Sequence, residues 1–230
     1  MRIAVIPARG GSKRIPRKNI REFAGKPIIA WPIGTALASG LFDKVIVSTD
    51  DVKIAEVARR VGALIPFMRP EQLSDDFADT KDVLRHAISA LKLENDADVQ
   101  VCCIYPTSVF VTPKYLEDGL NLLSHERCSF VLSITRVDPT VLRSFTQDTY
   151  GKLKMVFPEN FNRRTQDLPE LYCDAAQFYW GSVSTWQSDE PIFSENSRGI
   201  FIDSSKVSDI DTDLDWRSAE AIFQLIKRGG

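Results

Sequence analysis

Several large classes of protein are excluded by what this sequence lacks. Its 230 residues include only four cysteines, and their spacing matches neither a disulfide framework nor a metal site. We therefore expect four reduced thiols in a cytoplasmic protein. No apolar run approaches the roughly 18 residues of a membrane-spanning helix, and the apolar run after Met1 is too short for the core of a signal peptide.

An excess of positive charge is also missing. The chain carries 29 basic and 31 acidic residues, which gives a formal net charge of −2. Domains that bind nucleic acid by general electrostatics are usually strongly basic, so we expect no nucleic-acid partner and no membrane partner. Because 43% of the residues are hydrophobic, the chain can bury a core. The length predicts one domain over residues 1–230, with at most a small excursion from it.

Familiar catalytic signatures are missing as well. The phosphate loop G-x-x-x-x-G-K-[ST], the dinucleotide fingerprint G-x-G-x-x-G and the nucleophile elbow G-x-S-x-G do not occur. The two histidines, His86 and His125, lie in or at the end of expected helices without an obvious triad partner. We assign neither histidine a role and expect no covalent enzyme intermediate.

What the chain does contain is a regular alternation of two patterns. Short, mostly apolar runs are typical of strands that are buried on both faces, and they occur at residues 3–6, 45–47, 99–104 and 130–134. Helical periodicity lies between and after these runs, over about residues 27–39, 51–62, 80–91, 113–123 and 213–226. Pro32 inside the first helix predicts a late start or a kink.

This alternation predicts an α/β fold with a Rossmann-like, mostly parallel sheet flanked by helices. Ligands of such sheets bind beyond the carboxyl ends of the strands. Residues 135–186 differ, because they are rich in Asp, Gln, Asn and Pro and contain short runs at 153–157 and 177–180. We interpret residues 135–186 as a small antiparallel excursion that forms an interface or a lid.

A cluster of basic residues and glycines follows the first expected strand directly. The segment from Pro7 to Asn19 holds five basic residues. The backbone N–H groups of Gly10 and Gly11 can turn toward an anion, and Ser12 and Asn19 add neutral donors. We interpret this segment as a cradle for a triphosphate. The alternative is a basic loop that is merely exposed to solvent.

Two acidic residues stand two positions apart just before the last expected helix. On an extended segment, Asp209 and Asp211 point to the same side. Mg²⁺ accepts one or two carboxylates and completes its shell with water and substrate phosphates, so we expect Mg²⁺ here. Asp213 and Asp215 lie in the first helical turn, where they serve the helix dipole. The alternative is that all four acids cap the helix.

Two more polar loops follow expected strands on the same side of the sheet. One contains Tyr105, Pro106, Thr107 and Ser108, and the other begins at Arg69 after a third strand. Hydroxyl groups at these places can bond a base or a ribose, but they are equally common in ordinary turns. The spacing leaves both interpretations open.

Several segments resemble, in the same order, the motifs of the CMP-sialic acid synthetase (acylneuraminate cytidylyltransferase) family. These segments are IPARGGSK at residues 6–13, KN at 18–19, FDKVIVSTD at 42–50, RP at 69–70, PTS at 106–108 and DIDT at 209–212. The resemblance implies a fold of the nucleotide-diphospho-sugar transferase type and a homodimer built through the excursion. It also implies that CTP and a nonulosonic acid react, with Mg²⁺, to give a CMP-sugar for surface glycans or flagellin and pyrophosphate.

The resemblance assigns roles by position. It implies nucleotide contacts from Ala8, Arg9, Gly10, Gly11, Ser12, Lys13, Asn19, Arg69, Thr80 and Thr107. It implies catalytic roles for Lys13, Lys18 and Asp211, and metal ligation by Asp209 and Asp211. For the sugar it implies Tyr105, Arg164, Gln166, Tyr172, Asp174, Gln177 and Tyr179. No protein general base stands out, and a metal-bound hydroxyl or Asp211 is the nearest candidate.

The sugar is predicted from the departures within this pattern. The segments RTQDL at 164–168 and DAAQFYWG at 174–181 resemble the members that use pseudaminic acid. Sialate members typically have Gln at the position of Tyr105, Arg at that of Cys173 and Asn at that of Ala175. We therefore expect pseudaminic acid as substrate. The alternatives are N-acetylneuraminate, the eight-carbon sugar acid of lipopolysaccharide, a CTP-binding protein without turnover, and a purely structural protein.

Overall fold

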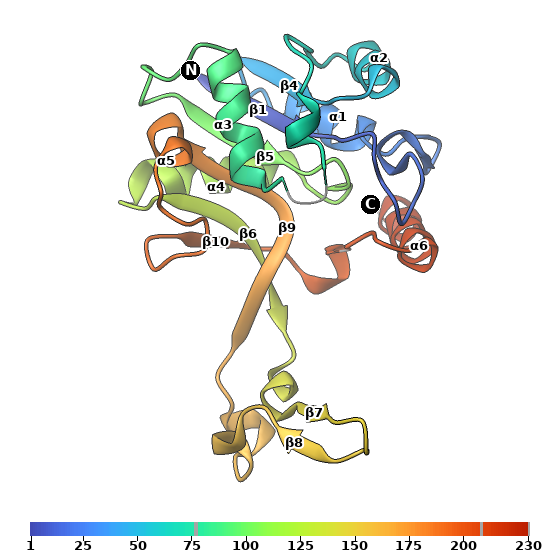
Figure 1. Cartoon of the computed structure of the whole chain (residues 1–230), viewed down its shortest axis with the longest axis vertical. Coiled ribbons are helices and arrows are strands. Elements are labelled where there is room, and N and C mark those ends of the chain that lie inside the picture. Colours follow the sequence, from blue (N-terminus) through green and yellow to red (C-terminus); the bar gives the residue numbers. More distant parts are fainter. Residues whose placement is uncertain (76–77, 208, 230) are drawn as a thin grey trace.

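The computed structural model describes residues 1–75, 78–207 and 209–229 and shows an α/β body from which a slender arm projects (Figure 1). The central sheet has the strand order β10-β6-β9-β5-β1-β4. Its strands are β1 (Arg2–Pro7), β4 (Lys44–Ser48), β5 (Gln100–Ile104), β6 (Phe130–Val137), β9 (Leu171–Ser182) and β10 (Arg198–Phe201). Strand β1 runs parallel to β4 and β5, and β10 runs parallel to β6, whereas β9 is antiparallel to both β5 and β6. The predicted, mostly parallel sheet is confirmed.

Strand β1 shows why the body has helices on both faces of the sheet. Ala4 and Ile6 belong to one buried cluster, and Ile3 and Val5 belong to another. The first cluster includes side chains of α1 (Ala30–Ala38), α2 (Val52–Arg60) and α4 (Pro113–His125). The second includes side chains of α3 (Thr80–Ala90) and α5 (Val183–Gln187). An uninterrupted apolar run is therefore required, because both sides of the strand are buried.

The predicted helix starts are confirmed by their caps. Asp51, Asp79 and Thr112 each accept a hydrogen bond from a backbone N–H in the first turn of α2, α3 and α4. Helix α1 starts late, at Ala30, so that Pro32 lies in its first turn, where a missing N–H costs no helical hydrogen bond. The expected third strand before Arg69 is reduced to a single bridge between Leu64 and Ile46.

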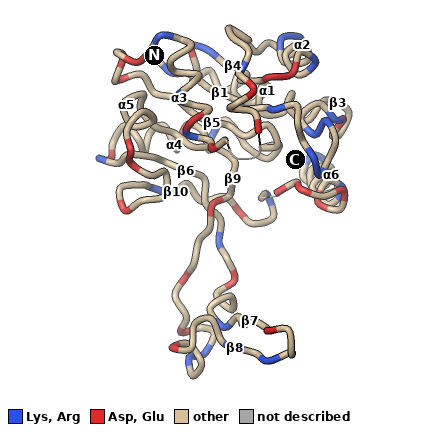
Figure 2. Tube along the Cα trace, in the orientation of Figure 1, with Lys and Arg blue, Asp and Glu red and all other residues tan. Residues whose placement is uncertain are grey.

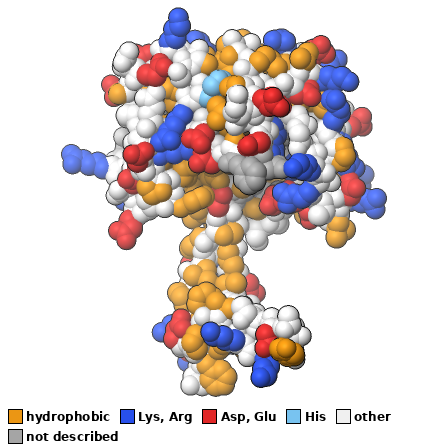
Figure 3. All heavy atoms as spheres, viewed as in Figure 1, with side chains coloured by type: hydrophobic (Ala, Val, Ile, Leu, Met, Phe, Trp, Pro, Cys, Tyr) orange, Lys and Arg blue, Asp and Glu red, His pale blue; other side chains and the backbone are white. Residues whose placement is uncertain are grey.

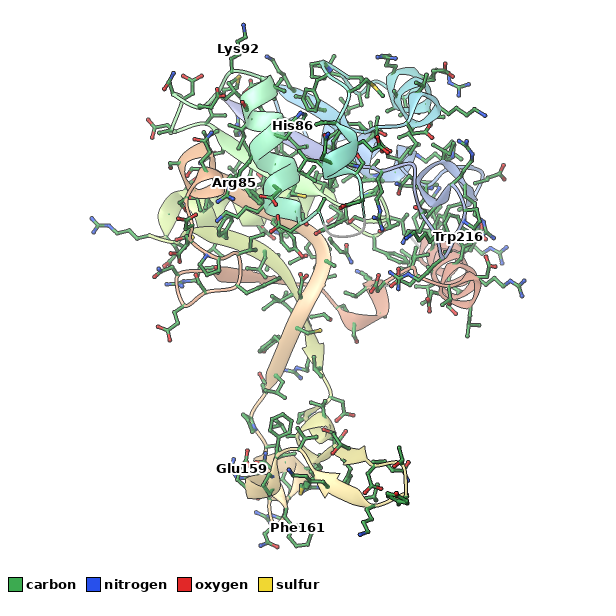
Figure 4. The ribbon with its side chains drawn as sticks, viewed as in Figure 1. Arg85, His86, Lys92, Glu159, Phe161 and Trp216 are labelled. Carbon is green, nitrogen blue, oxygen red and sulfur yellow. The ribbon has the colours of Figure 1, made fainter. Side chains whose placement is uncertain are left out.

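A third buried cluster holds the C-terminal helix α6 (Asp213–Gly229) against the short hairpin of β2 (Glu22–Phe23) and β3 (Lys26–Pro27). The ring of Phe23 meets those of Trp216 and Phe223 edge to face, with centroids 5.6 and 5.5 Å apart. Trp216 is labelled in Figure 4. This packing brings the acidic motif before α6 beside the basic loop after β1, although the two are about 190 residues apart in sequence, as in the Lys18–Asp211 pair.

The arm is narrower than the predicted excursion over residues 135–186. It leaves the body where the outer halves of β6 and β9 continue to pair, from Thr135–Cys173 to Val137–Leu171, and it carries β7 (Phe145–Gln147) and β8 (Leu153–Met155). The run at 177–180 is not part of the excursion. Phe178 and Trp180 fill one core cluster and Tyr179 fills the other, so this run closes the gap between β5 and β6.

Short 3-10 turns complete the structure, at Lys18–Ile20, Glu71–Leu73, Pro139–Arg143, Pro158–Asn160, Thr165–Asp167 and Ser204–Lys206. Basic and acidic positions are interspersed over the body and the arm in the described part of the chain (Figure 2). None of the helices in the described part of the chain is long and apolar enough to cross a membrane.

Candidate active site

A cavity of about 360 Å³ opens at the carboxyl ends of β1 and β5, where the strand-end rule predicts a ligand. Its wall comes from the basic loop after β1, the loop after β5, the start of α3, strand β9 and the acidic motif. The lining residues are Pro7, Arg9, Ser12, Lys13, Arg14, Ile15, Lys18, Asn19, Arg69, Ala78, Asp79, Thr80, Val83, Tyr105, Pro106, Thr107, Asp174, Ala176, Tyr179 and Asp209. A cavity of this size accommodates a small-molecule ligand.

The basic loop after β1 is fastened to the loop after β4. The backbone N–H of Gly10 donates to Oδ1 of Asp50 at 2.9 Å. A Cβ at Gly10 would lie 2.9 Å from the Cβ of Asp51, so glycine is needed for this close approach, whereas Gly11 faces open space. The side chain of Asn19 is buried and donates from Nδ2 to the carbonyl of Arg9 at 2.9 Å. Asn19 therefore shapes the loop as well as lining the cavity.

The basic loop also meets the acidic motif. Lys18 Nζ donates to the carbonyl of Ile210 at 2.7 Å and lies 3.4 Å from Oδ1 of Asp211. Nη1 of Arg14 lies 2.5 Å from Oδ2 of Asp211. Asp211 does not line the cavity itself, but its two cationic partners do.

Asp209 does line the cavity, and its negative charge is less compensated by nearby cations than that of Asp211. Burial, and then the neighbouring charge of Asp211, raise the pKa of Asp209. Asp215, which we expect to serve the helix dipole, caps α6 as the alternative predicts, because its carboxylate accepts the N–H of Thr212 at 2.7 Å and its own N–H donates back to the Thr212 hydroxyl. Asp213 instead pairs with Arg21 at 2.5 Å.

Arg69 is a buried cation in the cavity wall. Its side chain is 4% exposed, and Nε and Nη2 have no hydrogen-bond partner among the described residues. The nearest carboxylate oxygen, Oδ1 of Asp50, is 3.8 Å from Nη2, which is too long for a hydrogen bond. Burial lowers the pKa of Arg69, and the same cause, followed by the charge of Arg69, lowers the pKa of His86 behind it. Unpaired buried N–H groups at a cavity wall indicate a ligand with acceptor atoms.

Another part of the cavity wall is formed by the side chains of Thr80, Tyr105, Asp174 and Tyr179. The hydroxyls of Thr80 and Tyr105 are 2.5 Å apart, and the Tyr179 hydroxyl donates to Oδ2 of Asp174. The two tyrosine rings meet edge to face with centroids 5.6 Å apart. Burial raises the pKa of both tyrosines, so both hydroxyls stay protonated near neutral pH.

The other residues predicted to bind sugar lie outside this cavity. The side chain of Gln177 is buried and donates to the carbonyl of Lys206 at 2.8 Å. Tyr172 lies on the outer half of β9, where its hydroxyl donates to Glu170 at 2.9 Å. Arg164 and Gln166 lie in the arm, far from the cavity of their own chain, as the labelled arm residues Glu159 and Phe161 show (Figure 4). Ala8, Gly10 and Gly11 shape the basic loop without lining the cavity.

Some residues of the site escaped prediction. Asp50 lies three residues after the expected strand at 45–47, so the strand-end rule that selected the basic loop could have selected it too. Asp79, the residue before the expected helix at 80–91, both caps α3 and lines the cavity. Ala176 lines the cavity with a φ of 48°, and no local sequence signal marks that conformation.

The predicted state of the cysteines agrees with the structure. All four are free, and burial raises the pKa of Cys102 and Cys103. In the described part of the chain, no group of three or more His, Cys, Asp or Glu side chains is arranged to hold a metal ion. Any cation at Asp209 would therefore complete its shell with other oxygen atoms, such as those of water or of a substrate.

A family model described as cytidylyltransferase matches residues 3–197. The chain belongs to the cytidylyltransferase family. It is thus an enzyme of the nucleotidyltransferase class, as the sequence motifs predict.

Curated relatives match this cytidylyltransferase over nearly its full length. A pseudaminic acid cytidylyltransferase of Campylobacter jejuni is 37% identical over 223 residues, which are 97% of this chain and 96% of the relative. A CMP-N,N'-diacetyllegionaminic acid synthase of Legionella pneumophila is 38% identical over 235 residues, covering 97% of this chain and 96% of the relative. An N-acylneuraminate cytidylyltransferase B of Danio rerio is 34% identical, covering 95% of this chain and 50% of the relative.

A solved structure supports the fold. That of a CMP:2-keto-3-deoxy-manno-octonic acid synthetase has a TM-score of 0.73 and covers 98% of this chain and 99% of its own, at 18% sequence identity. The predicted nucleotidyltransferase-type fold is confirmed.

Proposed function

We propose that this cytidylyltransferase joins CTP to a nonulosonic acid, with pseudaminic acid as the preferred sugar, and releases pyrophosphate. The observation that carries the proposal is one cavity that is lined by two chemically different groups of residues. One group belongs to the basic loop, and the other consists of Tyr105, Asp174 and Tyr179. The relatives with names of this activity support the same reaction.

The reaction is a displacement at phosphorus. The anomeric hydroxyl oxygen of the sugar attacks the α-phosphorus of CTP. The bond between that phosphorus and the oxygen that bridges the α- and β-phosphates breaks, and pyrophosphate leaves with the electron pair of that bond. The sugar hydroxyl gives up its proton. Such a step depends on positioning and on offsetting charge more than on a protein nucleophile.

The residues of the cavity suit these tasks. Arg9, Lys13 and Lys18 place three cations on the side of the basic loop, where the triphosphate binds in our proposal. Arg69 offers unpaired N–H groups to the acceptor atoms of the cytosine base, and Thr107 lies beside it in the wall. No second nucleophile or covalent step is required.

Asp209 and Asp211 fit a magnesium ion in their chemistry. Both are hard oxygen donors, and the pKa of Asp209 is raised first by burial and then by the charge of Asp211, both of which a bound cation would offset. Arg14, which is 71% exposed at its side chain, pairs with Asp211 and would have to yield part of that contact. When bound, a divalent cation offsets phosphate charge and lowers the pKa of a hydroxyl. We propose that Asp209 and Asp211 hold Mg²⁺ together with the phosphates of CTP.

We further propose that two copies form a dimer through the arm. Apolar side chains lie along the whole arm, from the outer halves of β6 and β9 to its tip (Figure 3). The exposed apolar side chains of the arm include Phe145, Leu153 and Phe161. Arg164 and Gln166 can contact a sugar only in a neighbouring copy, because their own cavity is far away. A two-fold dimer is the commonest arrangement that covers such surfaces mutually. Light scattering that finds a monomer at micromolar concentration would reject this part of the proposal.

A release assay tests the reaction. The enzyme is incubated with CTP, Mg²⁺ and, separately, pseudaminic acid, N,N'-diacetyllegionaminic acid or N-acetylneuraminate, and pyrophosphate and CMP-sugar are measured. We expect the highest kcat/KM with pseudaminic acid. Equal values, or a preference for N-acetylneuraminate, would show that the sugar is wrong. CTP binding without release with any sugar acid would show that the protein only binds nucleotide.

Mixed dimers test the arm. Asp211→Asn disables the cavity of its own chain, and Arg164→Ala disables only the arm that reaches the partner. If the arm acts between chains, mixing the two inactive variants restores one of two sites in each mixed dimer, about a quarter of wild-type activity overall for random exchange. No recovery, with exchange proved by differently tagged chains, would contradict the arrangement.

A further inference from the structure

Strand β9 contains a bulge where it borders the cavity. Between the pairs Leu132–Tyr179 and Ile134–Asp174, strand β6 advances by two residues and β9 by five. In a regular strand, residues five apart face opposite sides of the sheet. Because Leu132 and Ile134 lie on the same side of β6, the three extra residues return Asp174 to the side of Tyr179. The bulge therefore aims a carboxylate into the cavity, a common use of bulges.

Buried hydrogen bonds hold this bulge in place. Oγ of Ser133 accepts the N–H of Gln177 and of the following residue, at 3.1 and 3.2 Å. Oγ of Ser108 donates to the carbonyl of Gln177 at 2.8 Å. Oδ1 of Asp174 accepts the N–H of Ala176 at 2.9 Å, which supports the left-handed backbone there. The position of Asp174 is thus set by three elements and not by a mobile loop.

The carboxylate determines the direction of the hydroxyl next to it. An ionised carboxylate can only accept, so the Tyr179 hydroxyl donates to Asp174. The Tyr179 oxygen keeps its lone pairs, and the ring of Tyr105 packs edge to face against that of Tyr179. The hydroxyls of Tyr105 and Thr80 hydrogen-bond each other, and either can be the donor. Asp174 and Tyr179 therefore present lone pairs, and no proton, to a ligand in the cavity.

We propose that Asp174 makes this wall an acceptor surface that selects the O–H and N–H donors of the sugar acid. The inference rests on the proposed function, because it places a sugar acid in the cavity. Among the described residues, each carboxylate oxygen of Asp174 has one hydrogen-bond partner, which leaves a lone pair for a ligand. The sugar's own carboxylate is repelled by Asp174 and attracted by the basic loop. Asp174 therefore also orients the sugar.

A second hollow gives the selected group somewhere to lie. A cavity of about 450 Å³ shares Asp79, Thr80, Tyr105, Asp174 and Tyr179 with the first one. Its other lining residues are Lys81, Pro191, Ile192 and Phe193. Asp174 and the two tyrosines therefore border both hollows. A sugar whose donor groups bind Asp174 and Tyr179 can extend onto the apolar surface of the second hollow.

Two simpler roles for Asp174 make different predictions. If Asp174 only holds the bulge, its loss lowers thermal stability and weakens both substrates together. If it is only a negative charge near anionic substrates, its removal improves the binding of the sugar acid. The acceptor role alone predicts weaker sugar binding with unchanged CTP binding.

The test is Asp174→Asn, which keeps the size of the side chain and an oxygen for Ala176 but replaces the acceptor of the Tyr179 hydroxyl with an N–H donor. At saturating CTP we expect KM for pseudaminic acid to rise about tenfold or more. KM for CTP and the melting temperature should match the wild type. Tyr179→Phe, which keeps the ring and the charge of Asp174, should give a smaller rise. Asp118→Asn, which removes an exposed partner of Lys114 on α4, is the matched control and should change nothing.

The outcomes separate this inference from the proposed function. An unchanged or lower KM for pseudaminic acid in Asp174→Asn, on an active wild type, overturns the inference alone. A parallel rise in both KM values with a lower melting temperature also overturns it, in favour of the structural role. Failure of the wild type to release pyrophosphate with every sugar acid overturns the proposed function and the inference with it.

Discussion

Replacement of Asp50 tests whether one carboxylate organises both the basic loop and Arg69. Its Oδ1 accepts the N–H of Gly10 at 2.9 Å and is the counter-ion of Arg69 at 3.8 Å. Asp50→Ala removes both contacts. Asp50→Asn keeps an acceptor for Gly10 and removes only the charge, so the pair of variants separates the two roles.

The structure indicates the size of each effect. A hydrogen bond to a charged acceptor contributes about 1.5–3 kcal/mol. The ion pair contributes less, about 1 kcal/mol, because the Asp50 side chain is 28% exposed and the separation is long. Asp50→Ala should therefore cost roughly 2–4 kcal/mol, or about 5–15 °C in melting temperature for a chain of this length. Asp50→Asn should cost only a few degrees.

The same contacts predict the effect on nucleotide binding. If the loop after β1 binds the triphosphate, its release from Asp50 should raise KM for CTP by about tenfold or more in Asp50→Ala, and less in Asp50→Asn. KM for the sugar acid should change little in either variant. Pyrophosphate release at varied CTP, calorimetric titration of CTP and thermal melts measure these quantities. If Asp50→Ala melted and bound CTP like the wild type, our account of this loop would be refuted.

Two further predictions concern the acidic motif and the histidine behind Arg69. Asp211→Asn should lower kcat by about two to three orders of magnitude, which corresponds to about 3–5 kcal/mol in the activation barrier. The fold and the binding of CTP without metal should persist. Near-normal turnover would show that Asp211 does not belong to the proposed metal site. Burial favours the neutral form of His86 and lowers its pKa below 6.5 in the folded protein. As the pH falls through 6.5, the unfolded chain therefore binds a proton at this histidine more readily than the folded chain does. The free energy of unfolding should therefore decrease from pH 6.5 downward, and His86→Gln should flatten that decrease in denaturant titrations; an identical slope in both proteins would show that His86 does not cause it.

Local patterns determined the helices and the inner strands of this protein. Strand β1 is an apolar run because both of its sides are buried, so its sequence alone distinguishes it from a half-exposed strand. The caps Asp51, Asp79 and Thr112 act through N–H groups within a few residues of themselves, which makes helix starts readable from sequence. Because the carboxyl ends of parallel strands meet at one edge of a sheet, the strand pattern alone suffices to place the loops after β1 and β5 at one ligand site.

Only the tertiary structure decided which distant residues meet. The run at 177–180 could not be assigned to the main sheet from its composition, because an antiparallel strand between β5 and β6 is set by pairing and not by local preference. The same holds for Arg164 and Gln166: their residue types suit a sugar acid, but the arm carries them away from their own cavity. The direction of Asp174 depends on three extra residues in one strand and on a buried serine in the next, and a one-dimensional pattern contains neither.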